Sequence, residues 1–413
     1  LAAEKGDDLP VSWMQRDERY REKLATPDVT VADLIGDIDP IKAANQRLTY
    51  ADEEVIHYGI IPRTNRGIFA VNEVPDLAPR IQVALLNILE ERDLQIRGFP
   101  VRIPMDVVLV FSANPEDYTS RGNIITPLKD RIDSQILTHY PQNVQTAMQI
   151  TGQEAWVNRP GKATIELPDY VRELIEQIAF VARESELVDQ SSGVSARLTI
   201  SAMELLQSNL ERRAALTRDQ HIFPRLSDLA MVLPAITGKV EMVYEGEQQG
   251  SEVVARKLIG AAVAKLFESK FPPVERAGVT GRRGYEMDND ELEDAFAGRR
   301  VKKPAPPPRE EPKREVKSEQ NYDAILAWFV EGNKVTLSDE QPFVEYFREL
   351  NRVPKLAETA KKYIHAKHEF EQAFWMEMIL EGMHQALRLA REDLDSTITF
   401  QELMKFNVLR TVK

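Results

Sequence analysis

The sequence predicts an α/β protein in which a parallel sheet is followed by helical regions. Two apolar runs of buried-strand length, GIFAV at 67–71 and DVVLVF at 106–111, are each followed by polar residues, and an amphipathic helix separates them. From about Pro168 onward, apolar residues recur with the period of a helix. Because ligands of parallel sheets lie beyond the carboxyl ends of the strands, we expect functional residues directly after these two runs.

The segment between the two predicted strands contains a helix and a hairpin. The helix is predicted by apolar residues spaced at i, i+4, i+7 and i+8, which are Ile81, Leu85, Ile88 and Leu89. LQIRGFPVRI then predicts two short strands joined by a tight turn at Arg97-Gly98. The order strand, helix, hairpin and strand favours a parallel sheet core.

The chain divides into four predicted parts. Residues 1–160 form the α/β domain and residues 161–280 form a small helical domain, because three segments in the latter carry helical apolar faces. Residues 281–320 are acidic, then basic, then proline-rich, which predicts a disordered or semi-extended linker. Residues 321–413 are predicted to be a separate, all-α C-terminal module, from the helical spacing of Phe343, Tyr346, Phe347 and Leu350.

Composition excludes several classes of protein. The 413 residues are 43% hydrophobic, which is enough for a real core, and 66 acidic against 53 basic side chains give a net charge of −13. This balance argues against a protein that mainly grips nucleic acid. The absence of cysteine excludes disulfides, thiolate metal sites and cysteine nucleophiles. No apolar run reaches the ~18 residues of a membrane span, and no secretory signal opens the chain, so the sequence predicts a cytoplasmic protein.

The residues that follow the two strands are the first candidates for chemistry. Glu73 is placed to polarise a water molecule, and Asn72 before it to hold hydrated Mg²⁺ through a bound water. Asn72 brings an amide oxygen without charge, so we expect weaker magnesium binding than an aspartate would give. Asn114, after the second strand, is placed to orient water and a γ-phosphate. Taken singly, Glu73 also fits a strand cap and Asn114-Pro115 also fits a turn.

Two arginines and two histidines are weaker candidates. Arg131 in PLKDRID can reach a neighbouring subunit's γ-phosphate, and Arg197 begins a predicted helix, but isolated surface arginines are common. His365 and His368 have a spacing that can bind a metal on a helix. They lack the His-Glu-x-x-His pattern, so a solvated helix face is the favoured interpretation for them.

The order and spacing of these motifs resemble an AAA+ ATPase of the MoxR and magnesium-chelatase I-subunit branch. The resemblance is carried by RGIFAVNEV, LQIRGFPVRI, VLVFSANPED and PLKDRID, and it covers roughly residues 31–270. It implies a P-loop-type AAA+ sheet core with an all-α lid. The segment LIGDIDPIKAANQRLTYADEEVIHYGIIPRTNRG resembles the family's helix-2 insertion, and the hairpin around Arg97 to Pro100 resembles its pre-sensor-1 insertion.

By this resemblance each candidate residue acquires a role. Asn72 and Glu73 stand at Walker B, Asn114 at sensor 1, Arg131 at the arginine finger and Arg197 at sensor 2. The implied cofactors are ATP and Mg²⁺. The implied assembly is a homo-oligomeric ring, hexameric in this family, that remodels a protein partner as MoxR chaperones or metal-inserting chelatases do.

One family motif is missing from the sequence. The phosphate-binding Walker A loop, GxxxxGK[ST], belongs upstream of Walker B, and nothing in residues 1–66 fits it. Either truncation or degeneration explains the missing loop. Truncation is favoured because the chain opens at Leu1 and lacks the family's first strand and helix. Without the loop, the given sequence alone is expected to be inactive. The leading hypothesis is an ATPase. The alternatives are a non-catalytic AAA+-shaped scaffold or regulator and, third, a nucleic-acid-directed regulator.

Overall fold

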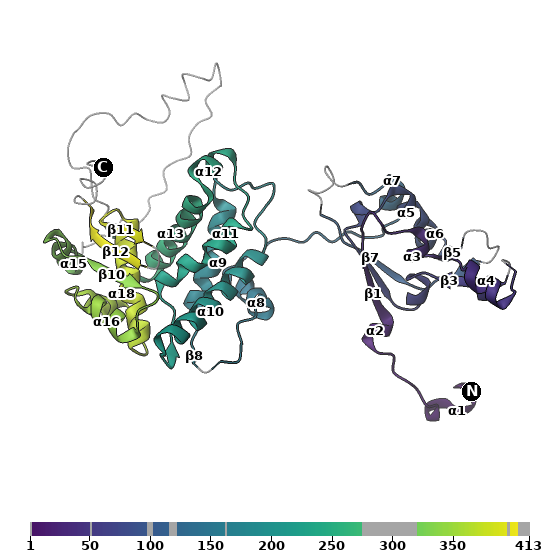
Figure 1. The fold of residues 1–413 in the computed structure, drawn as a ribbon, viewed down its shortest axis with the longest axis horizontal. Coiled ribbons are helices and arrows are strands. Elements are labelled where there is room, and N and C mark those ends of the chain that lie inside the picture. The colour runs from purple at the N-terminus through teal and green to yellow at the C-terminus, as the bar shows by residue number, and fades with distance from the viewer. Residues whose placement is uncertain are drawn as a thin grey trace, which may run out of the picture. The chain divides into compact units, whose positions relative to one another are not determined.

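The structure is a computed structural model of the whole chain, and it describes residues 2–49, 52–96, 102–114, 122–161, 163–274, 320–394 and 397–403. The chain forms two compact units, residues 1–139 and residues 140–413 (Figure 1). The connection of the predicted hairpin at Arg97 to Pro100 and nearly all of the predicted linker 281–320 lie outside the described residues. The finer domain limits therefore remain predictions.

The first unit is built on a three-stranded parallel sheet in the order β1-β4-β7. The predicted strands are present as β4 (Ile68–Asn72) and β7 (Val108–Phe111), and β1 (Tyr20–Leu24) is added at one edge. Gly67 precedes β4 where the chain runs against Arg19, and a Cβ there would collide with the Arg19 carbonyl. The α/β fold class with a parallel sheet core is thus confirmed.

One face of this sheet carries the core of the first unit. Phe69 and Val71 are buried on that face, under α5 (Pro79–Ala84) and α6 (Leu86–Glu90) with the predicted apolar positions Ile81, Leu85 and Ile88. On the other face, Ile68 is 44% exposed and Val108 is 59% exposed. The core therefore lies on one side of the sheet within the described residues.

Short elements complete the first unit. The predicted hairpin is present as the antiparallel pair β5 (Asp93–Gln95) and β6 (Arg102–Pro104). β2 (Gly36–Ile38) pairs with β3 (Ile56–Tyr58). Between them in the sequence, α4 (Pro40–Gln46) begins after Asp39, whose carboxylate accepts hydrogen bonds from two backbone N–H groups. The remaining helices are α1 (Ala2–Lys5), α2 (Arg16–Arg19), α3 (Val31–Leu34), α4 (Pro40–Gln46) and α7 (Thr126–Asp130).

The second unit begins with the predicted helical region. The three predicted helices are α9 (Asp169–Glu184), α10 (Arg197–Thr217) and α13 (Ser251–Lys270), which pack together (Figure 1). Two short strands, β8 (Thr164–Ile165) and β9 (His221–Ile222), form a parallel pair beside them. The smaller helices are α8 (Val144–Glu154), α11 (Leu233–Thr237) and α12 (Tyr244–Gln249), with a 3₁₀ segment at Leu226–Val232.

The C-terminal part corrects one expectation. It is not all-α, because β10 (Val335–Ser338), β12 (Thr397–Glu402) and β11 (Leu389–Leu394) form an antiparallel sheet in that order. TITFQE alternates in burial with a period of two, as a half-buried strand does. The helices are α15 (Gln320–Val330), α16 (Phe343–Asn351), α17 (Leu356–Tyr363) and α18 (Glu369–Gln385).

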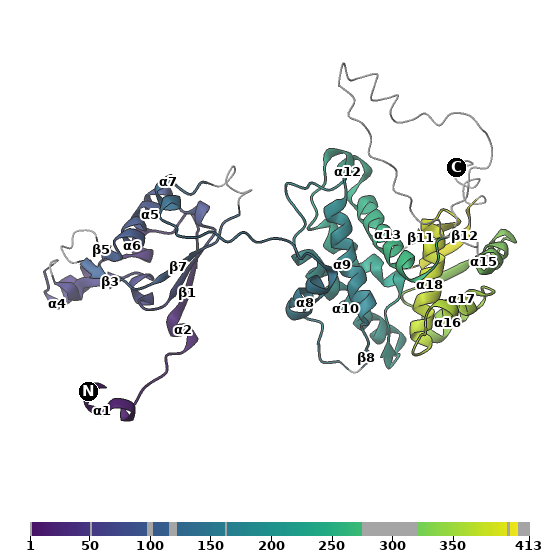
Figure 2. The ribbon, with the colours of Figure 1, turned by 180° about the vertical axis from the view of Figure 1, so that it is seen from behind.

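The C-terminal part and the predicted lid share one hydrophobic core. α18 packs against α13, as both views show (Figures 1 and 2), and buried residues of both parts form a single cluster. No helix among the described residues combines the length and the apolar character that a bilayer crossing requires.

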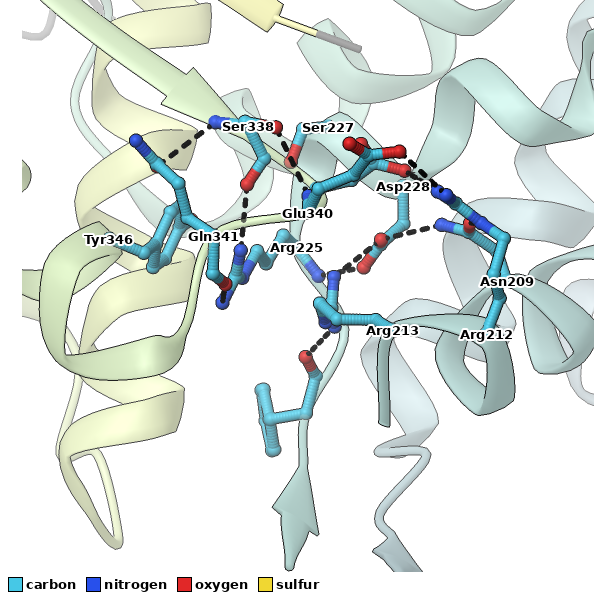
Figure 3. Close-up of polar contacts among 12 residues, drawn as sticks. Asn209, Arg212, Arg213, Arg225, Ser227, Asp228, Ser338, Glu340, Gln341 and Tyr346 are labelled. Carbon is cyan, nitrogen blue, oxygen red and sulfur yellow. Dashed lines mark hydrogen bonds and ion pairs between the residues drawn. The ribbon is translucent and has the colours of Figure 1, made fainter. Parts of the chain in front are cut away.

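Buried polar groups join the two parts of this unit as well (Figure 3). The Arg225 guanidinium donates to the carbonyls of Ser338 (2.7 Å) and Gln341 (2.8 Å) and lies 4.0 Å from the Tyr346 ring centroid. Glu377 of α18 accepts from Tyr346 and from the backbone N–H groups of Leu226 and Ser227. Burial lowers the pKa of Arg225 to about 10 and raises the pKa of the Glu377 carboxyl.

Candidate functional site

The carboxyl edge of the parallel sheet brings two predicted residues together with a third. Asn72 ends β4, Glu73 follows it, and Ser112 follows the neighbouring strand β7. The Ser112 hydroxyl accepts from the Glu73 N–H at 3.1 Å and donates to the Asn72 side-chain oxygen at 3.4 Å. Ser112 was not assigned a role from the sequence, although its hydroxyl directly after an apolar strand was a usable signal. Asn114 lies two residues further on and is exposed.

The backbone at Glu73 turns sharply away from the strand. Glu73 has a φ of 58°, in the left-handed region that residues other than glycine rarely adopt. The turn is held because the Val74 N–H donates to the Ser112 carbonyl (3.0 Å) and the Asp76 N–H donates to the Glu73 carbonyl (2.9 Å). Such strained residues are concentrated at functional sites. The turn gives Glu73 a fixed place at the sheet edge without a glycine.

Arg131 is held by a carboxylate of the same unit. It caps the C-terminal end of α7, and its Nε donates to the Glu90 carboxylate at 2.6 Å while another guanidinium nitrogen donates to the Pro127 carbonyl at 3.0 Å. The Arg131 side chain remains 28% exposed. Glu90, at the end of α6, was not singled out from the sequence. The pairing pre-orients the guanidinium at the surface of the first unit.

A buried glutamine fixes the segment that carries Arg131. The Gln82 side chain is fully buried in α5; its amide nitrogen donates to the carbonyls of Leu77 (2.9 Å) and Asn123 (3.1 Å). Its oxygen accepts from the Ile125 N–H at 2.9 Å. All three partners are backbone groups, so Gln82 ties the segment just before α7 to α5.

Arg197 belongs to the second unit. It is exposed at the first position of α10, and its backbone N–H donates to the Ser195 hydroxyl at 3.2 Å. The loop before it is anchored because the Tyr140 hydroxyl accepts from the Val194 N–H at 2.9 Å and the Arg183 guanidinium lies 4.2 Å from the Tyr140 ring centroid. The placement of Arg197 is therefore defined within its own unit.

The donor set at the sheet edge suits one half of a nucleotide site. Asn72, Glu73, Ser112 and Asn114 offer carboxylate, amide and hydroxyl oxygens, which suit a hydrated magnesium ion and a water nucleophile. The sequence contains no GxxxxGK[ST] run to cradle phosphates. These four residues therefore suit the orientation of a water molecule and contact with a γ-phosphate. They do not supply a phosphate-binding loop.

Comparison with known proteins agrees with this geometry. Residues 12–132 match the family "AAA domain (dynein-related subfamily)". The matched stretch includes Asn72, Glu73, Asn114 and Arg131, and the predicted relationship to AAA+ ATPases is confirmed. The chain thus carries an AAA domain. No curated protein matches the chain.

Several solved structures are similar to this chain at low sequence identity. A presumed ATPase from Cytophaga hutchinsonii ATCC 33406 is 17% identical, with 58% of this chain and 76% of that chain covered and a TM-score of 0.25. NtrX from Brucella abortus in complex with ATP is 16% identical, with 61% of this chain and 53% of the NtrX chain covered and a TM-score of 0.35. The chain therefore spans about half of NtrX. A complex between subunits BchI and BchD of magnesium chelatase is 18% identical, with 55% and 72% covered and a TM-score of 0.26. These TM-scores are low, and we transfer no residue role from these structures.

Proposed function

We propose that the intact protein is an AAA+ ATPase that couples ATP hydrolysis in an oligomeric ring to remodelling of a protein partner. The observation that carries the proposal is the meeting of Asn72, Glu73 and Ser112 at the carboxyl ends of adjacent parallel strands, inside the stretch that matches the AAA domain. Parallel sheets place their ligands at this edge.

Each residue has a defined task in this proposal. Glu73 orients the attacking water and takes its proton, and Asn114 aligns that water with the γ-phosphate. Asn72 accepts a hydrogen bond from a water of the magnesium shell, while Ser112 holds Asn72 and Glu73 in register. When bound, Mg²⁺ neutralises charge on the phosphate oxygens.

The arginines extend the site beyond one subunit. Arg131 exchanges Glu90 for the γ-phosphate of the neighbouring subunit's nucleotide, since both are anionic oxygen acceptors for the same guanidinium. Arg197, at the first position of α10, couples movement of the predicted lid to hydrolysis. A hexameric ring, a MoxR-type or chelatase-like protein partner and a cytoplasmic location belong to the same proposal. The acidic net charge of −13 fits a protein partner better than nucleic acid.

A non-catalytic scaffold is the second candidate, and the uncharged Asn72 at Walker B favours it. Titration calorimetry of the full-length protein with ATP and Mg²⁺, followed by a phosphate-release assay, separates the two. The ATPase proposal expects saturable ATP binding and steady phosphate release. Binding no greater than that of a buffer blank would favour the scaffold, and retention on DNA at physiological salt would instead support a nucleic-acid-directed regulator.

A further inference from the structure

Two histidines and a glutamate converge in the second unit, and none of them belongs to the proposed ATP site. Glu166 follows β8, His221 lies in β9, and His368 immediately precedes α18. One carboxylate oxygen of Glu166 lies 3.2 Å from Nε2 of His368 and 3.4 Å from Nε2 of His221. One ligand atom from each residue falls within 4.8 Å of the others. We propose that these three side chains form a binding site for Zn²⁺.

The two separations between Glu166 and the histidines match those of a zinc coordination sphere. Zinc binds imidazole nitrogen and carboxylate oxygen at about 2.0–2.2 Å, so two ligands at a tetrahedral angle lie about 3.3 Å from each other. The two measured nitrogen–oxygen separations, 3.2 and 3.4 Å, bracket that value. Two imidazoles and one carboxylate leave the fourth position to water.

Backbone and aromatic contacts hold the ligands in place. β8 and β9 pair in parallel, and the Glu166 N–H donates to the Ile222 carbonyl at 3.0 Å, which fixes Glu166 beside His221. The His221 ring lies 4.8 Å from the Phe370 ring, and the His368 ring meets the Phe223 ring edge-on at 5.2 Å. The three side chains are 30% to 36% exposed, so an ion can enter from solvent.

Two existing hydrogen bonds of His368 have to yield to the ion, the bond between its Nε2 and the Glu166 carboxylate and the bond that its Nδ1 accepts. Nδ1 of His368 accepts from the Glu371 N–H at 3.1 Å and so caps α18. With zinc on Nε2, the ring proton resides on Nδ1, and this cap is lost. A single helix cap is weak compared with a set of three zinc ligands, and the acidic Glu369 and Glu371 in the first turn of α18 favour a nearby cation.

The site joins segments that are distant in the sequence. Glu166 and His368 are separated by 202 residues, and they belong to the predicted lid and the C-terminal part respectively. A bound ion would fasten the β8–β9 pair to the start of α18. Zinc binding should therefore stabilise the second unit as one body. His365, whose sequence spacing from His368 could suit a shared metal ion, is not among the converging ligands.

The test uses the full chain without an affinity tag, freed of metal by EDTA and dialysis, with ZnSO₄ for calorimetry and CoCl₂ for visible absorption. We expect one ion per chain, tetrahedral Co²⁺ bands and a higher melting temperature with zinc. His221→Gln, Glu166→Gln and His368→Asn should each weaken binding at least about 100-fold, since even loss of an outer-sphere partner costs up to that much. Asparagine at position 368 preserves a helix cap, so this variant separates the ligand role from the capping role.

His365→Gln is the matched control and should bind zinc as the parent does. The proposal is overturned if the parent binds no stoichiometric zinc, or if His365→Gln loses as much affinity as His221→Gln. It is also overturned if an excess of Mg²⁺ displaces zinc, because that result would indicate a nonspecific carboxylate site. Far-ultraviolet circular dichroism of each variant establishes that the fold is retained, and the three ligand variants test the site independently.

Discussion

Replacing Arg225 with methionine should weaken the polar connection between the C-terminal part and the predicted lid. Methionine is similar in length but has no charge and no N–H donors. The Arg225 side chain is buried, and its two bonds to the carbonyls of Ser338 and Gln341 join segments more than a hundred residues apart in sequence, at 113 and 116 residues. Its stacking on Tyr346 would also be lost.

The expected magnitude follows from these contacts. A hydrogen bond to a charged group contributes about 1.5–3 kcal/mol, and a desolvated cation–π contact contributes about 2 kcal/mol. Desolvation lowers the pKa of buried Arg225 to about 10, so burying this charge has a cost. Methionine removes that cost, which offsets part of the lost hydrogen-bond and cation–π energy. We expect Arg225→Met to lower the free energy of unfolding of the second unit by about 3–5 kcal/mol.

Urea unfolding followed by tryptophan fluorescence measures this effect, because Trp375 is buried in the core of the second unit. Arg352→Met is the matched control. Arg352 pairs with Glu349 on the protein surface, and its loss should cost at most about 0.5 kcal/mol. A loss below about 1 kcal/mol for Arg225→Met, with an unchanged m value, would refute the idea that this network joins the two parts.

Three further predictions concern Glu377, Gln82 and Gly193. Burial raises the pKa of Glu377 in the folded protein above its pKa in the unfolded chain. The protonated carboxyl therefore stabilises the fold below the unfolded-state pKa, and this contribution is lost as pH rises through the folded-state pKa. Glu377→Gln should flatten the dependence of unfolding free energy on pH in that range, measured by urea unfolding. Gln82→Met should cost the first unit about 2–4 kcal/mol and speed amide exchange at Ile125, because three backbone partners are lost. Gly193→Ala should cost at least about 1 kcal/mol, because Gly193 has a φ of 70° and a Cβ there would collide with the Tyr140 hydroxyl.

Each of these has an outcome that would contradict it. For Glu377 it is an unchanged pH profile in the glutamine variant. For Gln82 it is unaltered exchange at Ile125, and for Gly193 it is a variant as stable as the parent. Asn351→Ala, at an exposed position of α16 in the second unit, is a suitable surface control for the Glu377 and Gly193 variants.

Strong apolar patterns made part of the fold predictable. GIFAV and VLVF are short apolar runs that become β4 and β7, and the helical periodicity of the segments that form α9, α10 and α13 matches their buried faces. β1 was missed because YREKL is mostly charged; it lies at the edge of the sheet, where charged side chains reach water. The C-terminal sheet was missed because LAREDL has no clear alternation, although it forms a hairpin with the TITFQE segment that follows it, and because β10 pairs with β12 far along the sequence.

The candidate site was predictable only as far as its residues follow strands. Asn72 and Glu73 directly follow an apolar run, so sequence order placed them at the sheet edge. Glu90 and Gln82 act through contacts with residues 41 positions away, and nothing in local sequence indicates such pairs. The convergence of Glu166, His221 and His368 depends on tertiary packing in the same way.

The most direct test of the account is the turnover of ATP by the Glu73→Gln variant of the complete protein. Glutamine keeps the size of Glu73 and the backbone bond to Ser112 but cannot take a proton from water. The account predicts retained ATP affinity by calorimetry and loss of phosphate release to background. Phosphate release at the parent rate would contradict it.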